Sequence, residues 1–218
     1  MSVAVVEPPA INIAPPRFHA SSRNGNSHRF TLEEYFALNA ASERRYEYDE
    51  GMIIPMAGTT VPHNRIALNM SILFDRAFEG RDCEVYIKGI GFRVSNVKYR
   101  YPDVMAVCGT PVFDDNKPPC LLNPNVIVEV LSASTESIDK GRKIDEYLRS
   151  GSVTDYLLVE QERVSVLHMK RQEADEWLRK EYTDLSDTLV LASLGVSILL
   201  QEVYRKIKFD TEGEPQSA

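Results

Sequence analysis

The sequence predicts a mixed fold of the α/β or α+β class, in which helices flank a central mixed β-sheet. Two continuous apolar runs, DVMAV at 103–107 and NVIVEVL at 125–131, are typical of strands that are buried on both faces. Segments with helical periodicity and capping residues are interleaved with these runs and with other β-type segments. The chain has 218 residues, 43% of them hydrophobic, so it can bury one substantial core.

A single domain is expected from about residue 29 to 209. Residues 1–28 contain four prolines and no hydrophobic period, which predicts a flexible N-terminal tail, and 210–218 is expected to be a flexible C-terminal tail. The N-terminus has no basic stretch followed by an apolar one, so no signal peptide is predicted. No apolar run reaches about 18 residues, so no membrane span or membrane partner is expected.

The first element of the domain is predicted to be a helix. Thr31 and Glu34 have the spacing of a capping box, and Phe30 and Tyr35 have the spacing of a hydrophobic staple. The stretch RYEYDEGMIIPM at 45–56 then predicts two strands around a Glu-Gly turn.

A second helix is expected to start near Pro62, because proline suits the first turn of a helix. Its apolar stripe consists of Ile66, Met70, Leu73 and Phe74. The remaining predicted elements are strands near 84–88 and 90–95, the two apolar runs, a helix at 136–150, strands near 154–159, 163–168 and 175–183, and a short helix near 200–206. Gly151 is expected to end the helix at 136–150 as its C′ residue.

Composition restricts the function. The formal net charge of −7 argues against a protein that coats nucleic acid non-specifically, since such proteins neutralise phosphates with an excess of Lys and Arg. Residues 81–100 depart from this balance, with five basic and two acidic residues, so a modest basic rim is compatible with the sequence. The three cysteines include no CxxC pair and lack ligand spacing to a histidine. We therefore expect reduced thiols, no cysteine-ligated zinc site and a cytoplasmic location.

Acidic residues inside apolar runs are the main functional signal. Glu129 lies in the middle of VIVEVL, where a lone ionised carboxylate would cost several kcal/mol unless it were paired or bound to a metal. A buried ion pair with an arginine is the structural alternative. Asp103 follows a proline and opens the run DVMAV; a turn or cap role would explain it in isolation. Two acids on neighbouring buried strands would supply oxygen ligands for Mg²⁺ or Mn²⁺.

Three further residues complete the candidate site. Lys143 lies on the flank of the helix after Glu129 and would bring a positive charge to a phosphodiester, although a solvated helix-surface lysine is an equal alternative. Period-2 alternation puts Glu47 on the strand face opposite Tyr46 and Tyr48, where an exposed face is the simpler interpretation. His63 at the start of a helix could meet an anion or a catalytic water, but a surface histidine is the commoner outcome.

The order of these segments resembles a known family. The motifs are EYFALNAASERRYEYDEGMIIPMAG, His63-Asn64, YPDVMAV, NVIVEVLSAST and DKGRKIDEYLRSGSVTDYLLVE. Together they resemble a bacterial family of endonuclease-like proteins, the Uma-type branch of the PD-(D/E)XK superfamily, which is abundant in cyanobacteria. The resemblance runs from about residue 29 to the end of the domain and implies a restriction-endonuclease-like core. It also implies metal-dependent hydrolysis of nucleic acid with Mg²⁺ or Mn²⁺. DNA is expected ahead of RNA as the partner, although the sequence does not decide between them.

The resemblance also implies roles for individual residues. Asp103 and Glu129 would be metal ligands, with Glu47 and the backbone carbonyl of Val130 assisting. The superfamily pattern expects a lysine two residues after the second acid, where this chain has Leu131, so Lys143 would take the place of that lysine. By analogy with the superfamily, a homodimer is expected. The two alternatives are a nuclease-like module that has lost catalysis and binds nucleic acid or a protein, and a hydrolase that uses the carboxylate pair on a small substrate.

Overall fold

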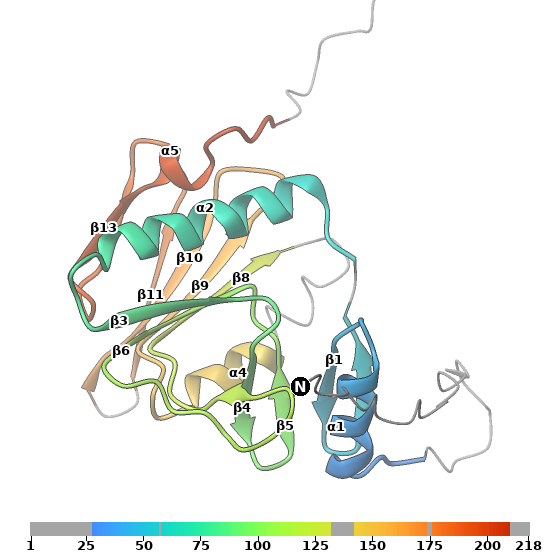
Figure 1. Cartoon of the computed structure of the whole chain (residues 1–218). Helices are drawn as coiled ribbons and strands as arrows, with labels where there is room; N and C mark the ends of the chain where they lie inside the picture. The colour runs from blue at the N-terminus through green and yellow to red at the C-terminus, as the bar shows by residue number, and fades with distance from the viewer. Residues whose placement is uncertain (1–27, 57, 132–141, 174–175, 210–218) are drawn as a thin grey trace, which may run out of the picture.

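The computed structural model describes residues 28–56, 58–131, 142–173 and 176–209. Within these residues the chain forms a six-stranded mixed sheet, a five-stranded sheet and a two-stranded hairpin, with helices packed against them (Figure 1). The predicted mixed α and β class, with helices flanking a central mixed sheet, is therefore confirmed.

The six-stranded sheet is the centre of the molecule. Its order is β11 (Trp177–Tyr182), β10 (Val166–Arg171), β9 (Asp155–Glu160), β8 (Val126–Leu131), β6 (Val104–Cys108) and β3 (Cys83–Ile87). Strands β8 and β9 are parallel and every other neighbouring pair is antiparallel. The central strand β8 is buried along its whole length, as its unbroken apolar run predicts.

The five-stranded sheet packs against α1 (Leu32–Ala41), which lies beside β1 in Figure 1. Its order is β2 (Met52–Pro55), β1 (Tyr46–Asp49), β5 (Lys98–Arg100), β4 (Gly91–Ser95) and β7 (Cys120–Leu121). A cluster of tyrosines from α1, β1 and β5, including Tyr35, Tyr48 and Tyr99, packs between this helix and this sheet. Alternation along β1 thus turns its tyrosines to this core and its acids to the other face.

Helices cover both faces of the six-stranded sheet. Helix α2 (Val61–Ala77) packs on one face together with α5 (Leu200–Val203) and the hairpin of β12 (Thr188–Leu191) and β13 (Val196–Leu199). Helix α4 (Arg142–Leu148) lies on the opposite face (Figure 1). In β8 the residues Val126, Val128 and Val130 face the α2 side. Glu129 has the opposite parity, so its carboxylate faces the α4 side, with Ile127.

The predicted helix starts are confirmed. Thr31 caps α1, and it exchanges hydrogen bonds with Glu34 as a complete capping box. Helix α2 begins after Thr60, whose hydroxyl accepts from the backbone N–H of His63, and Pro62 lies in the first turn. The two predicted strands of 45–56 are also present as β1 and β2.

The expected end of the helix at 136–150 is wrong in its detail. The helix ends at Leu148, and Gly151 does not have a left-handed backbone conformation. The guanidinium of Arg171, from β10, donates instead to the backbone carbonyls of Leu148 and Ser150. Arg171 therefore supplies hydrogen bonds to carbonyls at the end of this helix, which in other helices are often paired through a left-handed C′ glycine.

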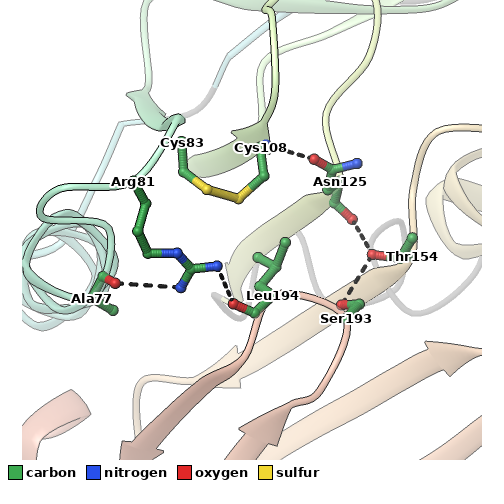
Figure 2. The surroundings of a disulfide bond; sticks show 8 residues. All are labelled: Ala77, Arg81, Cys83, Cys108, Asn125, Thr154, Ser193 and Leu194. Atoms are coloured by element: carbon green, nitrogen blue, oxygen red, sulfur yellow. Dashed lines mark hydrogen bonds between the residues drawn. A yellow bond between two sulfur atoms is a disulfide. The ribbon is translucent and has the colours of Figure 1, made fainter.

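The expectation of three reduced thiols is also wrong. Cys83 and Cys108 are directly opposite each other in the antiparallel register of β3 and β6 and form a disulfide, while Cys120 is free and buried. Figure 2 shows the disulfide beside Arg81, which donates to the carbonyls of Ala77 and Leu194. The sequence did not predict this pairing, because the two cysteines are 25 residues apart and only the strand register brings them together.

A buried aspartate–histidine pair lies in strands β9 and β10 of the same sheet. The carboxylate of Asp155 is 2.7 Å from Nε2 of His168, and both residues are buried. Asp155 also accepts hydrogen bonds from the hydroxyls of Thr154 and Ser193. Burial raises the pKa of Asp155, but the hydrogen bonds from His168, Ser193 and Thr154 outweigh it and hold the pKa below the usual 3.8.

Some predicted features lie outside the described residues. These are the tail at 1–28, apart from His28, the tail at 210–218, and the first part of the helix predicted at 136–150. The structure adds four short strands that the sequence did not predict: β5, β7, β12 and β13. In the described part of the chain, no helix is both long and apolar enough to cross a membrane.

Candidate active site

The strand register brings the two predicted acids together. Val104 of β6 pairs with Val128 of β8 in antiparallel register, so the next step outward sets Asp103 opposite Glu129. Both carboxylates are buried, with Asp103 5% and Glu129 4% exposed. Glu129 faces α4, whereas Asp103, just before β6, contacts His63 of α2. Two carboxylates that are 26 residues apart in the sequence thus lie at the same end of two adjacent central strands.

Asp103 is held by three partners. Its Oδ2 accepts from the backbone N–H of Val130 at 2.9 Å and lies 3.0 Å from Nε2 of His63. Nζ of Lys88 is 3.9 Å from Oδ1. Burial raises the pKa of Asp103 above its usual 3.8, although His63, the Val130 N–H, Lys88 and Lys143 all favour the ionised form.

Glu129 faces helix α4. Its Oε1 lies 3.3 Å from Nζ of Lys143 and accepts a hydrogen bond of 3.0 Å from the hydroxyl of Tyr147. Lys143 and Tyr147 are one turn apart on α4, so both side chains reach the same carboxylate. The interpretation of Lys143 as a solvated surface lysine is therefore wrong, because the residue is only 9% exposed and packs against the sheet.

Glu47 comes to the same lysine from the five-stranded sheet. Its Oε1 is 3.2 Å from Nζ of Lys143 and accepts from the backbone N–H of Tyr101 at 3.4 Å. Glu47 is 7% exposed, so the interpretation of this face of β1 as exposed is wrong. The face is buried because α4 contributes Lys143 to it, and the neighbouring strand β5 places Arg100 beside the acids of β1.

His63 is not a surface histidine. Its side chain is 12% exposed and its Nε2 contacts Asp103, because the first turn of α2 packs over the start of β6. The structure therefore brings together His63, Asp103 and the Val130 backbone in one group, and Glu47, Glu129 and Lys143 in an adjoining one. The two groups share the adjacent strands β6 and β8.

The sequence did not predict that Arg100 would form a buried ion network next to this site. Arg100 donates through Nε and Nη2 to the carboxylate of Glu146 at 2.9 Å each, and its Nη2 is 3.1 Å from Asp49. Lys98 lies 3.0 Å from Glu146 and 3.1 Å from Asp49. Two sequence spacings are consistent with this network. Lys98 and Arg100 are two residues apart and so share one face of their strand, and Glu146 follows Lys143 by three residues on α4.

The donor set suits a hard divalent cation. Around the site, the acidic side chains that are no more than 9% exposed are Glu47, Asp49, Asp103, Glu129 and Glu146. The Lys and Arg side chains of similar burial there are Arg100 and Lys143, at 3% and 11%, and Lys98, at 21%, also contacts Asp49 and Glu146. Among the described residues, these five acids therefore outnumber the Lys and Arg side chains there that are no more than 21% exposed. Carboxylate and carbonyl oxygens are the ligands that Mg²⁺ and Mn²⁺ prefer.

The described carboxylates nevertheless do not form a preorganised set of metal ligands. Among the described residues, no group of three or more His, Cys, Asp or Glu side chains is close enough to hold a metal ion. Glu47 and Glu129 both face the ammonium of Lys143 instead. A cation at this site would have to compete with Lys143 for one of these carboxylates.

The chain is similar in sequence to a known family and to two proteins of a cyanobacterium. The model of the Uma2 family, described as "Putative restriction endonuclease", matches residues 32–201. The Synechocystis protein slr1290 is 32% identical over 182 residues, which cover 83% of this chain and 94% of slr1290. A second Synechocystis protein, sll1609, is 32% identical over 152 residues, covering 69% of this chain and 86% of sll1609. Both relatives are described as uncharacterized.

A solved structure shares the fold. The crystal structure described as a putative nuclease from Anabaena variabilis matches 80% of this chain and 97% of its own with a TM-score of 0.64. The sequence identity is 15%, so this likeness concerns the fold alone. The predicted family resemblance and the predicted nuclease-like core are thereby confirmed.

Proposed function

The chain belongs to the Uma2 family, and from this premise we propose that it is a metal-dependent endonuclease that hydrolyses phosphodiester bonds of nucleic acid, DNA rather than RNA. The observation that carries the proposal is the position of Lys143. Its Nζ lies 3.2 Å from Glu47 and 3.3 Å from Glu129, so a helix supplies a lysine to the site where Leu131 leaves the strand without one.

The residues would divide the work as follows. Asp103 and Glu129, assisted by Glu47 and the backbone carbonyl of Val130, would hold Mg²⁺ or Mn²⁺. When bound, the cation would supply Lewis-acid stabilisation of the charge that develops on the phosphodiester. Lys143 would donate hydrogen bonds to the attacking water and to a phosphate oxygen, which positions the water and offsets negative charge in the transition state.

His63 would act through Asp103. Its Nε2 lies 3.0 Å from Oδ2 of Asp103, and the Val130 N–H donates to the same oxygen. These two contacts fix the orientation of the carboxylate and leave Oδ1 directed to the side of Lys88, at 3.9 Å. A carboxylate held in one orientation loses less freedom when it binds a cation, which strengthens the site.

The test is cleavage of a supercoiled plasmid and of a labelled single-stranded oligonucleotide with Mg²⁺, Mn²⁺ or EDTA. We expect the wild type to cleave only with metal, and both Asp103→Asn and Lys143→Met to lose about 100-fold or more in rate. Lys208→Met is the matched control, because Lys208 is exposed and outside the site, and it should keep full activity. Activity that persists in both site variants, or in EDTA, would refute the proposal.

Folding and metal binding must be measured in the same variants. Asp103→Asn keeps the shape of the side chain and an acceptor for the Val130 N–H, so thermal unfolding should change little. Calorimetry should show Mn²⁺ binding to the wild type and to Lys143→Met but weaker binding to Asp103→Asn. If Lys143→Met does not fold, Lys143→Arg provides the second test: it keeps the charge with a different donor geometry and should bind metal but cleave slowly.

One observation favours the alternative of a nuclease-like module that only binds nucleic acid or a protein. In the described residues the acids form no ready metal cluster, and Lys143 pairs with two of them. Such a module would show no calorimetric signal with Mg²⁺ or Mn²⁺ that depends on Glu129. Calorimetry of the wild type and of Glu129→Gln therefore distinguishes the nuclease from the binding module.

A further inference from the structure

A cavity of about 600 Å³ lies next to Asp103. Its walls come from three separate segments: residues 43–45 between α1 and β1, Met56 and Gly58 after β2, and Lys88 with Gly89 in the turn between β3 and β4. The volume lies within the range of about 300–1,000 Å³ that is typical of ligand pockets. A volume of this size suits a short stretch of a single strand better than the full width of a duplex.

The charged groups on the cavity wall are mostly basic. Among the described residues that line the cavity, they are Arg44, Arg45 and Lys88, against the acid Glu43. This local balance is opposite to the net charge of −7 of the whole chain, so the cavity is a place where a polyanion would be favoured. The basic rim that the sequence indicated at 81–100 thus contributes Lys88, while the two arginines come from another part of the chain.

The side chain of Arg45 is held in place before any ligand binds. Arg45 donates from its guanidinium to the backbone carbonyls of Asn39 and Ser42 at the end of α1. The side chain of Asn39, in turn, both donates to and accepts from the backbone of Tyr46, which joins the segment to β1. Arg44 is exposed, and among the described residues its side chain forms no hydrogen bond or ion pair, so its charge is available to a ligand.

Lys88 connects the cavity with the acids. Its Nζ is 3.9 Å from Oδ1 of Asp103, and its backbone N–H donates to the carbonyl of Asp103 at 3.2 Å. The next residue, Gly89, has a φ of +134°, a conformation that favours glycine, and a Cβ at this position would meet nothing within 4 Å. The turn therefore carries Lys88 on the common border of the cavity and the candidate active site.

We propose that this cavity binds the phosphates of a single-stranded segment of nucleic acid, directly beside the bond that is to be cut. Arg44 and Arg45 hold a backbone phosphate of the strand, and Lys88 holds the phosphate nearest to Asp103. The inference rests on the proposed function, because it names the substrate of the same site, and it adds that the substrate enters as a single strand. Ends, flaps and unpaired stretches would be bound in preference to intact duplex.

The experiment measures binding without cleavage. Fluorescence anisotropy in EDTA compares a labelled 12-nucleotide strand with the same sequence as a duplex, for the wild type, Arg44→Glu and Arg76→Glu. Arg76 is the matched control, because it is an exposed arginine near the opposite end of α2, about 20 Å along the helix from His63. Both variants carry the same change of charge, and neither replaces a residue of the candidate active site.

We expect the wild type to bind the single strand more tightly than the duplex. Arg44→Glu should lower the affinity for the strand roughly fivefold to tenfold at low salt. It should also make the slope of log affinity against log salt concentration shallower by about 0.7 for each phosphate that the protein no longer neutralises. Arg76→Glu should bind like the wild type. Equal weakening in both variants, equal binding of duplex, or equally tight Arg44-dependent binding of a polyglutamate peptide would each overturn the inference.

The outcome also separates this inference from the proposed function. A protein that cleaves nucleic acid with metal but whose strand affinity is unchanged in Arg44→Glu refutes the cavity alone. A protein that binds the strand through Arg44 but shows no metal-dependent cleavage refutes the nuclease alone.

Discussion

Replacing Arg100 by methionine tests whether the buried ion network holds helix α4 against the five-stranded sheet. The guanidinium is 3% exposed and donates to Glu146, to the carbonyl of Tyr48 and towards Asp49. From β5, Arg100 therefore links α4, which carries Lys143, to β1, which carries Glu47. Methionine keeps the apolar stem of the side chain but removes the charge and all of these hydrogen bonds.

The structure gives the expected size of the effect. Removing one partner of a buried ion pair costs about 3–5 kcal/mol, because the other charge stays buried without compensation. Here Lys98 still lies within 3.1 Å of both Glu146 and Asp49, so some compensation remains and the lower end applies. We therefore expect Arg100→Met to lose about 3 kcal/mol of the free energy of unfolding. Arg100→Lys should lose about 1–2 kcal/mol, since it keeps the charge but not the two-pronged contact with Glu146.

The assay is urea unfolding at 25 °C and pH 7.5, followed by far-ultraviolet circular dichroism and by the fluorescence of Trp177, the one tryptophan of the sequence. A total stability of about 5–15 kcal/mol would leave the variant folded enough to measure. Arg205→Met is the control, because Arg205 is exposed, and its stability should change by less than about 0.5 kcal/mol. A loss below about 1 kcal/mol in Arg100→Met would refute the argument that this arginine joins α4 to the five-stranded sheet.

Three further perturbations test other parts of the fold. Cys83→Ser should lower the free energy of unfolding by about 3.5 kcal/mol, the chain-entropy value for its 25-residue separation. Dithiothreitol should destabilise the wild type to a similar extent and leave this variant unchanged; a wild type indifferent to the reductant would contradict the disulfide. The pKa of Asp155 is lowered in the fold, so its stabilisation is present above about pH 3.8 and is lost as the pH falls through the lower folded-state value. In urea unfolding, Asp155→Asn should therefore be less stable than the wild type at pH 7 and closer to it at pH 3, and a difference that grows in acid would disprove the pairing. A Cβ on Gly91 would lie 2.6 Å from the sulfur of Cys120, so Gly91→Ala should lose about 1–3 kcal/mol and recover part of it when combined with Cys120→Ala. Gly151→Ala, where a Cβ meets nothing within 4 Å, should instead be neutral or slightly stabilising, and equal losses at both glycines would show that the close approach at Gly91 is not the cause.

Much of the fold was predictable because the signals were local. The capping box of Thr31 and Glu34 depends only on residues three apart, and it appears in the structure as expected. The run VIVEVL needed no partner to be recognised as a buried strand. The short strands β5, β7, β12 and β13 were not predicted, because segments of two to four residues carry too little periodicity and become strands only by pairing with neighbours.

The candidate site was predictable in its residues but not in its surroundings. Asp103 and Glu129 stood out because each interrupts or opens an apolar run. The burial of Glu47 and His63 was missed, since the strand β1 and the first turn of α2 look exposed when each is considered alone. The role of Arg100 was missed, because its ion network joins residues from three elements, β1, β5 and α4, and no spacing within one element shows which of them meet.

The sequence by itself determined which side chains have unusual chemistry, which strands are buried and which family motifs occur, because these depend on residue type and short-range pattern. Only the tertiary structure decided which of those side chains meet. The antiparallel register of β6 and β8 sets Asp103 opposite Glu129, and the packing of α4 brings Lys143 between Glu129 and Glu47. Register and packing are long-range properties, and they are chosen by the burial of whole faces rather than by any one residue.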